Sequence, residues 1–183
     1  MPLPPSVDRD ELHLRQIELR GFRRADSWYE VEAYLIDTKT EDVRVHDKRV
    51  VAAGEPFHSM AIRLVIDAEL CVMDVMASTD AAPYNICPEA TKALQRLKGE
   101  HIGPGWSKTI RDCLGGHKGC THLAELLRPL ATAAIQTLST TRTSRPEALD
   151  EAGRPRKIDS CYAYANYREL VRERWPSFFG TSR

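Results

Sequence analysis

The first half of the chain alternates apolar and polar residues, which is the pattern of half-buried β-strands. Within the segment 12–22 the run Arg15–Arg20 alternates, and residues 28–37 alternate with Tyr29, Val31 and Leu35 on one face. Side chains of a strand point to opposite faces in turn, so this apolar face is expected to be buried. The two stretches therefore predict two strands.

A charged stretch at 39–54 interrupts the alternation and predicts a loop, with one short strand at 49–52. Alternation returns in 61–66, a turn is expected at 67–69, and 70–77 continues as a strand. Consecutive strands joined by short turns form antiparallel hairpins. We therefore expect an antiparallel meander sheet in the N-terminal half.

The second half changes to a helical period, with apolar residues three or four positions apart in 88–98, 106–114 and 123–138. Pro129 lies inside the longest stretch and is expected to kink or locally open that helix. A further helix is predicted around 167–174. The whole pattern predicts an α+β fold, in which helices from the C-terminal half pack on the meander sheet.

The sequence divides into four segments by composition. We expect residues 1–10 to form a flexible leader and residues 11–139 to form the core α+β domain. Residues 140–157 are rich in Thr, Ser, Arg and Pro, and they predict a mobile connector. Residues 158–183 are expected to form a C-terminal helical segment that packs on the core.

Charge and composition narrow the functional class. Of the 183 residues, 26 are Lys or Arg and 26 are Asp or Glu, so nucleic acid is not an expected partner. No apolar run is long enough for a membrane span, and residues 1–10 contain no apolar signal segment. The five cysteines then predict free thiols in a reducing cytoplasm. A small-molecule substrate is the expected partner, and the oligomeric state stays open.

The segment Gly119–His122 is the main candidate for chemistry. Cys120 and His122 lie at the start of the long predicted helix, where free N–H groups and the helix dipole favour a thiolate or another anion. The glycines before this helix allow the backbone to approach a ligand closely. The alternative is that Thr121 only caps the helix and that Cys120 is a small buried residue.

Two further residues are candidates for the same site. Cys87 lies at the junction from the sheet to the first helix, and with Cys120 and His122 it would supply three soft metal ligands. The alternative is two unrelated free cysteines. His58 is a candidate general base or a further ligand, or a capping histidine without chemistry.

A substrate pocket is expected around these groups. Arg63 would hold a substrate carboxylate, or it would instead form a salt bridge across the sheet. Tyr84 and Trp106 would wall an apolar pocket. Gly119 and Thr121 would bind the substrate at the helix start, where developing negative charge is stabilised.

The roles of other polar residues stay open. Asp159 and Cys161 either fold back toward the site or have a solvated or core role. Cys71 and Cys113 are expected to pack in the core. The remaining histidines, His13 among them, have no partner that the sequence identifies.

These landmarks resemble a bacterial domain family of unknown function. The resemblance covers about residues 20–175, and its specific core is the run Gly119-Cys120-Thr121-His122. In the usual form an Asp follows the first histidine, whereas this chain has Ser59, so an acid role there does not transfer. Such proteins look like companions of bacterial catabolic enzymes that act on aromatic or acyl compounds. The other landmarks are His58, Met60, Arg63, Asp67, Pro83, Tyr84, Cys87, Gly105, Trp106, Leu123, Glu125 and Asp159 to Cys161.

The order of strands and helices is also similar, more distantly, to iron–sulfur scaffold proteins. Cys87 and Cys120 would match two scaffold cysteines, which hold a cluster or zinc in those proteins. His122 follows its cysteine instead of preceding it, and no third scaffold cysteine is present in the earlier loop. These departures count against cluster assembly, and a shared fold does not by itself transfer function.

Three functional hypotheses follow. The first is a small-molecule enzyme of bacterial catabolism, a cofactor-independent lyase or decarboxylase for an aromatic or acyl substrate, with His58, Cys120 and His122 as catalytic residues. The second is a scaffold-type protein that binds zinc or iron through Cys87, Cys120 and His122. The third is a non-catalytic interaction module.

Overall fold

The computed structural model describes residues 3–46, 48–142 and 147–181. Residues 143–146, in the predicted connector, and residues 1–2, in the predicted leader, lie outside these ranges. The chain divides into a larger N-terminal unit and a smaller C-terminal unit, with the boundary between Thr140 and Thr141.

The N-terminal unit contains a four-stranded antiparallel sheet with the strand order β1-β2-β5-β6. The predicted meander is therefore confirmed; β1 is as long as its predicted segment, and the other three strands are longer than the sequence pattern indicated. The predicted loop carries a separate two-stranded hairpin. The strands are β1 (His13–Arg23), β2 (Tyr29–Lys39), β3 (Val43–Arg44), β4 (Val50–Val51), β5 (Pro56–Ile66) and β6 (Val72–Ala81).

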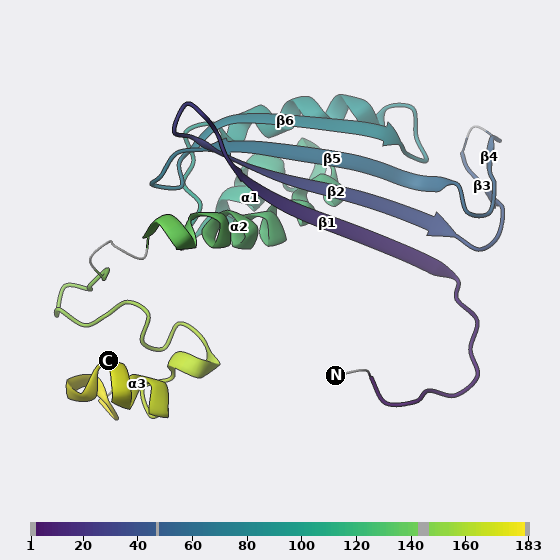
Figure 1. The fold of residues 1–183 in the computed structure, drawn as a ribbon. Coiled ribbons are helices and arrows are strands. Elements are labelled where there is room, and N and C mark those ends of the chain that lie inside the picture. The colour runs from purple at the N-terminus through teal and green to yellow at the C-terminus, as the bar shows by residue number, and fades with distance from the viewer. Residues whose placement is uncertain (1–2, 47, 143–146, 182–183) are drawn as a thin grey trace. The chain divides into compact units, whose positions relative to one another are not determined.

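Helices from the second half of this unit cover one face of the sheet (Figure 1). The first predicted helix is a 3-10 helix, the second has the predicted bounds, and the third continues through Pro129 for 22 residues. The α+β prediction is thus confirmed. The helical elements are η1 (Cys87–Leu97), α1 (Trp106–Leu114), η2 (Gly116–Lys118) and α2 (Thr121–Arg142).

The C-terminal unit is small and contains short helical elements. The helix predicted near its end is α3, which begins at Glu169. A local turn precedes it, in which the Asp150 carboxylate accepts hydrogen bonds from the backbone N–H groups of Ala152 and Arg154. The helical elements are η3 (Tyr162–Tyr164), α3 (Glu169–Arg174) and η4 (Pro176–Phe178).

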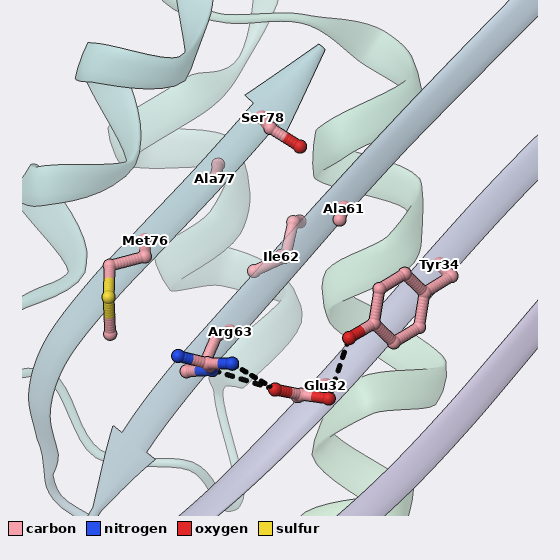
Figure 2. A pocket seen from close by; sticks show the side chains of 8 residues that line it. All are labelled: Glu32, Tyr34, Ala61, Ile62, Arg63, Met76, Ala77 and Ser78. Carbon is pink, nitrogen blue, oxygen red and sulfur yellow. Dashed lines mark hydrogen bonds and ion pairs between the residues drawn. The ribbon is translucent and has the colours of Figure 1, made fainter. Parts of the chain in front are cut away.

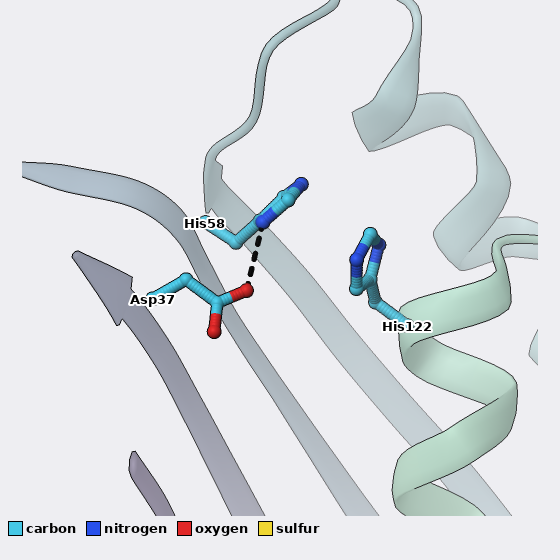
Figure 3. Close-up of side chains that lie close together, drawn as sticks. All are labelled: Asp37, His58 and His122. Atoms are coloured by element: carbon cyan, nitrogen blue, oxygen red, sulfur yellow. Dashed lines mark hydrogen bonds and ion pairs between the residues drawn. The ribbon is translucent and has the colours of Figure 1, made fainter. Parts of the chain in front are cut away.

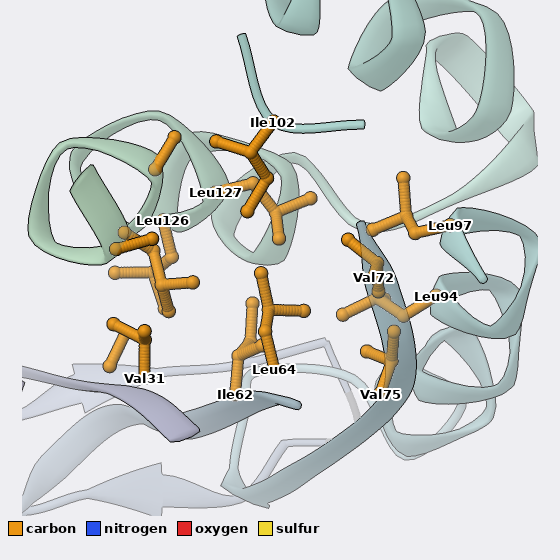
Figure 4. Close-up of a cluster of buried hydrophobic side chains, with 14 of the residues drawn as sticks. Val31, Ile62, Leu64, Val72, Val75, Leu94, Leu97, Ile102, Leu126 and Leu127 are labelled. Carbon is orange, nitrogen blue, oxygen red and sulfur yellow. The ribbon is translucent and has the colours of Figure 1, made fainter. Parts of the chain in front are cut away.

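The core lies between the sheet and the helices. Val31 of β2 and Ile62 and Leu64 of β5 point toward Leu126 and Leu127 of α2 (Figure 4). All five are at most 1% exposed. Because alternate residues of a strand share a face, the alternation in the sequence becomes one apolar layer under the helices.

Strand β1 and helix α2 approach each other closely at Gly21. A Cβ atom on Gly21 would overlap the Thr137 hydroxyl group and would lie 2.8 Å from Thr137 Cβ. The Thr137 hydroxyl is held in place because it donates to the Ala133 carbonyl at 2.8 Å. Gly21 therefore allows the C-terminal half of α2 to cross the sheet.

We predict that Gly21→Ala destabilises the protein by about 1–3 kcal/mol, because the new methyl group overpacks this contact. An alanine at an unhindered strand position would instead be favourable. Urea unfolding in wild-type and Thr137→Ala backgrounds measures the effect. The cost should be smaller with Thr137→Ala, and an equal cost in both backgrounds would contradict the contact as its cause.

Candidate functional site

Polar residues replace the apolar ones at one end of the buried sheet face. Along β2 the buried series Val31, Ala33, Leu35 continues into Asp37, which is 2% exposed. On β5 His58 lies directly opposite Asp37, and on β1 Arg15 lies opposite Asp37 from the other side. Three strands therefore place polar side chains together beneath the helix layer.

Asp37 is the centre of this group. Its Oδ1 atom lies 2.7 Å from Arg15 Nε and 3.1 Å from His13 Nε2, and its Oδ2 atom lies 2.8 Å from Arg15 Nη2 and 2.9 Å from His58 Nδ1. Burial alone would raise the pKa of this carboxyl group, but hydrogen bonds from the three donor residues outweigh it and hold the pKa well below its usual range. Asp37 is therefore a carboxylate.

The Asp37 carboxylate fixes which ring nitrogen of His58 donates a hydrogen bond. An ionised carboxylate can only accept hydrogen bonds, so His58 must donate to it from Nδ1–H. In the neutral imidazole the Nε2 atom then carries the free lone pair. Phe57 packs edge-on against the His58 ring, with 5.0 Å between ring centroids. The ring is thus held in one orientation.

His122 faces His58 from the first turn of α2 (Figure 3). The two ring centroids lie 4.0 Å apart, and the ring planes are inclined by 39°. Cys120, just before the helix, places its Sγ atom 4.0 Å from His122 Nδ1. The structure therefore places His122 next to both His58 and Cys120.

The His58 imidazole is shifted toward its neutral form. Burial lowers the pKa of His58, positive charge on the neighbouring His122 lowers it further, and Asp37 offsets these effects only in part. A neutral imidazole with a free Nε2 atom can accept a proton or bind a metal ion.

The cluster also has the composition of a metal site. Asp37, His58 and His122 can each offer one ligand atom such that these atoms lie within 4.8 Å of one another, the one such group among the described residues. Neither Cys87, which begins η1, nor Cys120 is a member, so the structure does not assemble the predicted set of Cys87, Cys120 and His122 in this way. Both Asp37 oxygens are already occupied by donors, which leaves the two imidazoles as the better ligands.

The glycine before α2 has a packing role. Gly119 is extended, with φ of −161°, and a Cβ atom there would lie 3.0 Å from the Leu114 carbonyl oxygen. This close approach lets the chain turn from the end of α1 into α2. Thr121 is the first, exposed residue of α2. Substrate binding by Gly119 and Thr121 stays a prediction.

The structure places three predicted pocket residues away from the cluster. Arg63 follows the opposite parity of β5 from His58, so it lies on the outer sheet face, where its Nε donates to Glu32 at 2.7 Å (Figure 2). Trp106 is 5% exposed and donates from its indole to the Leu127 carbonyl at 2.9 Å, which makes it a core residue. Tyr84 is 53% exposed beside His46.

Asp159 and Cys161 lie in the C-terminal unit. Asp159 accepts hydrogen bonds from the Arg154 guanidinium at 2.6 Å and from the Asn166 backbone N–H at 2.9 Å. Cys161 is exposed. Asp159 thus links Arg154 and Asn166 within this unit.

Sequence reasoning missed Asp37, Arg15 and His13. Each lies at a position where the alternation of its strand points toward the helices, as Leu35 does on β2 and Leu19 does on β1. The sequence did contain a signal for Asp37, because this acidic residue continues the alternating series of buried apolar residues along β2. The cations that neutralise it come from another strand, so only the pairing register identifies them.

The family described as "Protein of unknown function (DUF2889)" matches residues 13–136. No curated protein and no solved structure shows significant similarity to the chain. Among the described residues, no helix is both long and apolar enough to cross a membrane. The match covers the whole sheet and the cluster residues, so it confirms the predicted resemblance to a family of unknown function.

We predict that His58 makes the folded protein less stable in mild acid. Because the folded-state pKa of His58 is lowered, the unfolded chain binds more protons between that pKa and about 6.5. Stability should therefore fall as the pH drops through this interval, with a slope of up to about 1.4 kcal/mol per pH unit. Urea unfolding of wild type and His58→Gln at pH values from about 7.5 to 5 measures it. An identical slope in both proteins would contradict this assignment.

Proposed function

The chain belongs to the DUF2889 family, and since that family carries no assigned activity, we propose from the site that the protein is an enzyme using general acid–base catalysis. The observation that carries the proposal is the buried Asp37–His58 pair facing His122. A carboxylate saturated by hydrogen bonds, an oriented histidine and a second polar group form a recurrent arrangement for proton transfer.

In this proposal His58 acts as the base. Its Nε2 atom takes a proton from the substrate, and Asp37 stabilises the imidazolium that forms because it already accepts the Nδ1–H. The lowered pKa of His58 keeps the base unprotonated at neutral pH. Arg15 and His13 are positioning residues, since they act on the substrate only through Asp37.

His122 supplies the complementary proton. Its ring lies beside His58, so both imidazoles can reach the same small substrate at adjacent atoms. The Cys120 thiol contacts His122 Nδ1 and can exchange a proton with it, or act as the nucleophile that the sequence suggested. The base and acid are thus on different elements, β5 and α2.

This pair suits a lyase or decarboxylase that needs no cofactor. Such a reaction leaves an electron pair on a carbon beside a carbonyl group or an aromatic ring, and a histidine returns a proton to that carbon. The likeness to companions of bacterial catabolic enzymes points to aromatic or acyl substrates.

A metal centre is the second candidate, because His58, His122 and Asp37 lie within mutual ligand range. The fit is to two imidazoles, His58 Nε2 and one nitrogen of His122, with Asp37 behind His58 in the position where metal-bound histidines commonly meet a carboxylate. A zinc or iron ion bound there would supply Lewis-acid chemistry.

We predict that His58→Gln and His122→Gln each reduce turnover about 100-fold or more, because each removes one proton-transfer group. The assay incubates purified protein with aromatic and acyl carboxylic acids in deuterated water, and mass spectrometry records loss of CO2 and uptake of deuterium at carbon. His117→Gln is the matched control, since His117 is an exposed histidine of η2. Turnover that survives both site changes would refute the acid–base assignment.

The metal candidate makes a different prediction. Elemental analysis of protein purified without chelator should then show about one equivalent of zinc or iron, reduced strongly in His58→Gln and unchanged in His117→Gln. Metal-free protein that turns over its substrate would exclude this candidate. Stoichiometric metal lost together with turnover in His58→Gln would favour it over unassisted acid–base catalysis.

A further inference from the structure

The two edge strands of the sheet, β6 and β1, differ in whether their outward backbone groups are hydrogen-bonded. At the β6 edge, backbone hydrogen bonds join Val72 to Gly99 at 2.8 Å and to Glu100 at 2.9 Å, and the Gln95 amide caps the Val75 carbonyl. At the β1 edge, no backbone hydrogen bond between described residues reaches the side away from β2. An edge strand directs every second N–H and C=O outward, so β1 presents an open row of them.

Strand β1 is also exposed on both of its faces. Leu14 and Phe22, on the outer face, are 41% and 42% exposed, and Ile17, on the helix side, is 46% exposed. The helix layer contacts β1 at Gly21, which meets Thr137 of α2, and at Arg15, which pairs with Glu125 of α2 at 3.4 Å. The strand is 11 residues long and contains no proline or bulge that would block pairing.

We propose that the partner of this edge is a second copy of the chain, paired antiparallel through β1 about a two-fold axis normal to the sheet at Leu19. The two sheets then form one continuous sheet with the helices of both copies on the same face. An axis of this kind keeps inner residues opposite inner residues and outer residues opposite outer ones.

Several registers place inner residues opposite inner residues and outer residues opposite outer ones. Charge favours the register with the axis at Leu19. With the axis at Leu19, Glu18 lies opposite Arg20 of the second copy, and the symmetry gives this pair twice on the outer face. An axis at Glu18 would oppose the two Glu18 side chains, and an axis at Ile17 would oppose no opposite charges. Glu18 and Arg20 are each 57% exposed, so both are available.

Shape agrees with the same register on the helix side. Ile17 lies opposite Gly21 of the second copy, which has no side chain of its own. Thr137 of α2 lies over that glycine, so the second copy's helix would cover the Ile17 side chain that its own helix leaves exposed. The one like-charge pair is Arg15 with Arg23, and Arg15 is already bound by Asp37.

The test is a charge swap measured by sedimentation equilibrium on the full chain. Wild type should be a dimer at micromolar concentration, and Glu18→Arg should raise its dissociation constant about tenfold or more, because both pairs become repulsive. The double change E18R/R20E restores opposite charges across the axis and should return the constant to within about threefold of wild type.

Controls separate the interface from effects on folding. Glu18 also pairs with Arg20 of its own strand at 2.6 Å, and the double change preserves that pair, so thermal unfolding should be the same in wild type and E18R/R20E. Glu41→Arg, in the exposed loop after β2, makes the same change of charge and should leave the dimer intact. A monomeric wild type, a dimer insensitive to Glu18→Arg, or a swap that fails to restore it would each overturn the proposal.

Discussion

A carboxylate that is buried away from water must be neutralised by hydrogen-bond donors and cations around it. This requirement determines the arrangement of residues at the polar end of the buried sheet face. Asp37 is 2% exposed, and four donor contacts from β1 and β5 surround its two oxygens. None of these donors is near Asp37 in the sequence. The register of three strands must therefore be correct before the carboxylate can be buried, which ties the site to the fold.

The same interaction sets the chemistry of His58. Because Arg15 and His13 keep Asp37 ionised, Asp37 can only accept, and His58 is committed to donating from Nδ1. Burial beneath α2 then favours the neutral ring. A polar group placed at the end of an apolar layer thus gains orientation from the sheet and a lowered pKa from the helix layer, while its outer nitrogen stays available.

Strand β1 serves both the site and the surface. Its inward side chains supply Arg15 and His13 to Asp37, while its other edge is open and its apolar residues are half exposed. The outer sheet face is stabilised differently, by the Glu32–Arg63 ion pair and the Tyr34 hydroxyl that donates to Glu32 at 2.7 Å. The polar groups of the two faces are thus separated by the sheet itself.

The sequence by itself determined the strands, the helices and the α+β class, because periods of two and of 3.6 residues follow directly from local geometry. It also marked His58, Cys120 and His122, since each lies in a distinctive local run of residues. It overlooked Asp37, although Asp37 is in phase with Leu35, because a single acidic residue at the end of a strand reads as solvated. It could not show that Asp37 pairs with Arg15, that Arg63 lies on the opposite sheet face from His58, or that Cys87 lies outside the group of potential ligands. Those outcomes depend on strand register and on which segments meet in space, and only the tertiary structure fixes both.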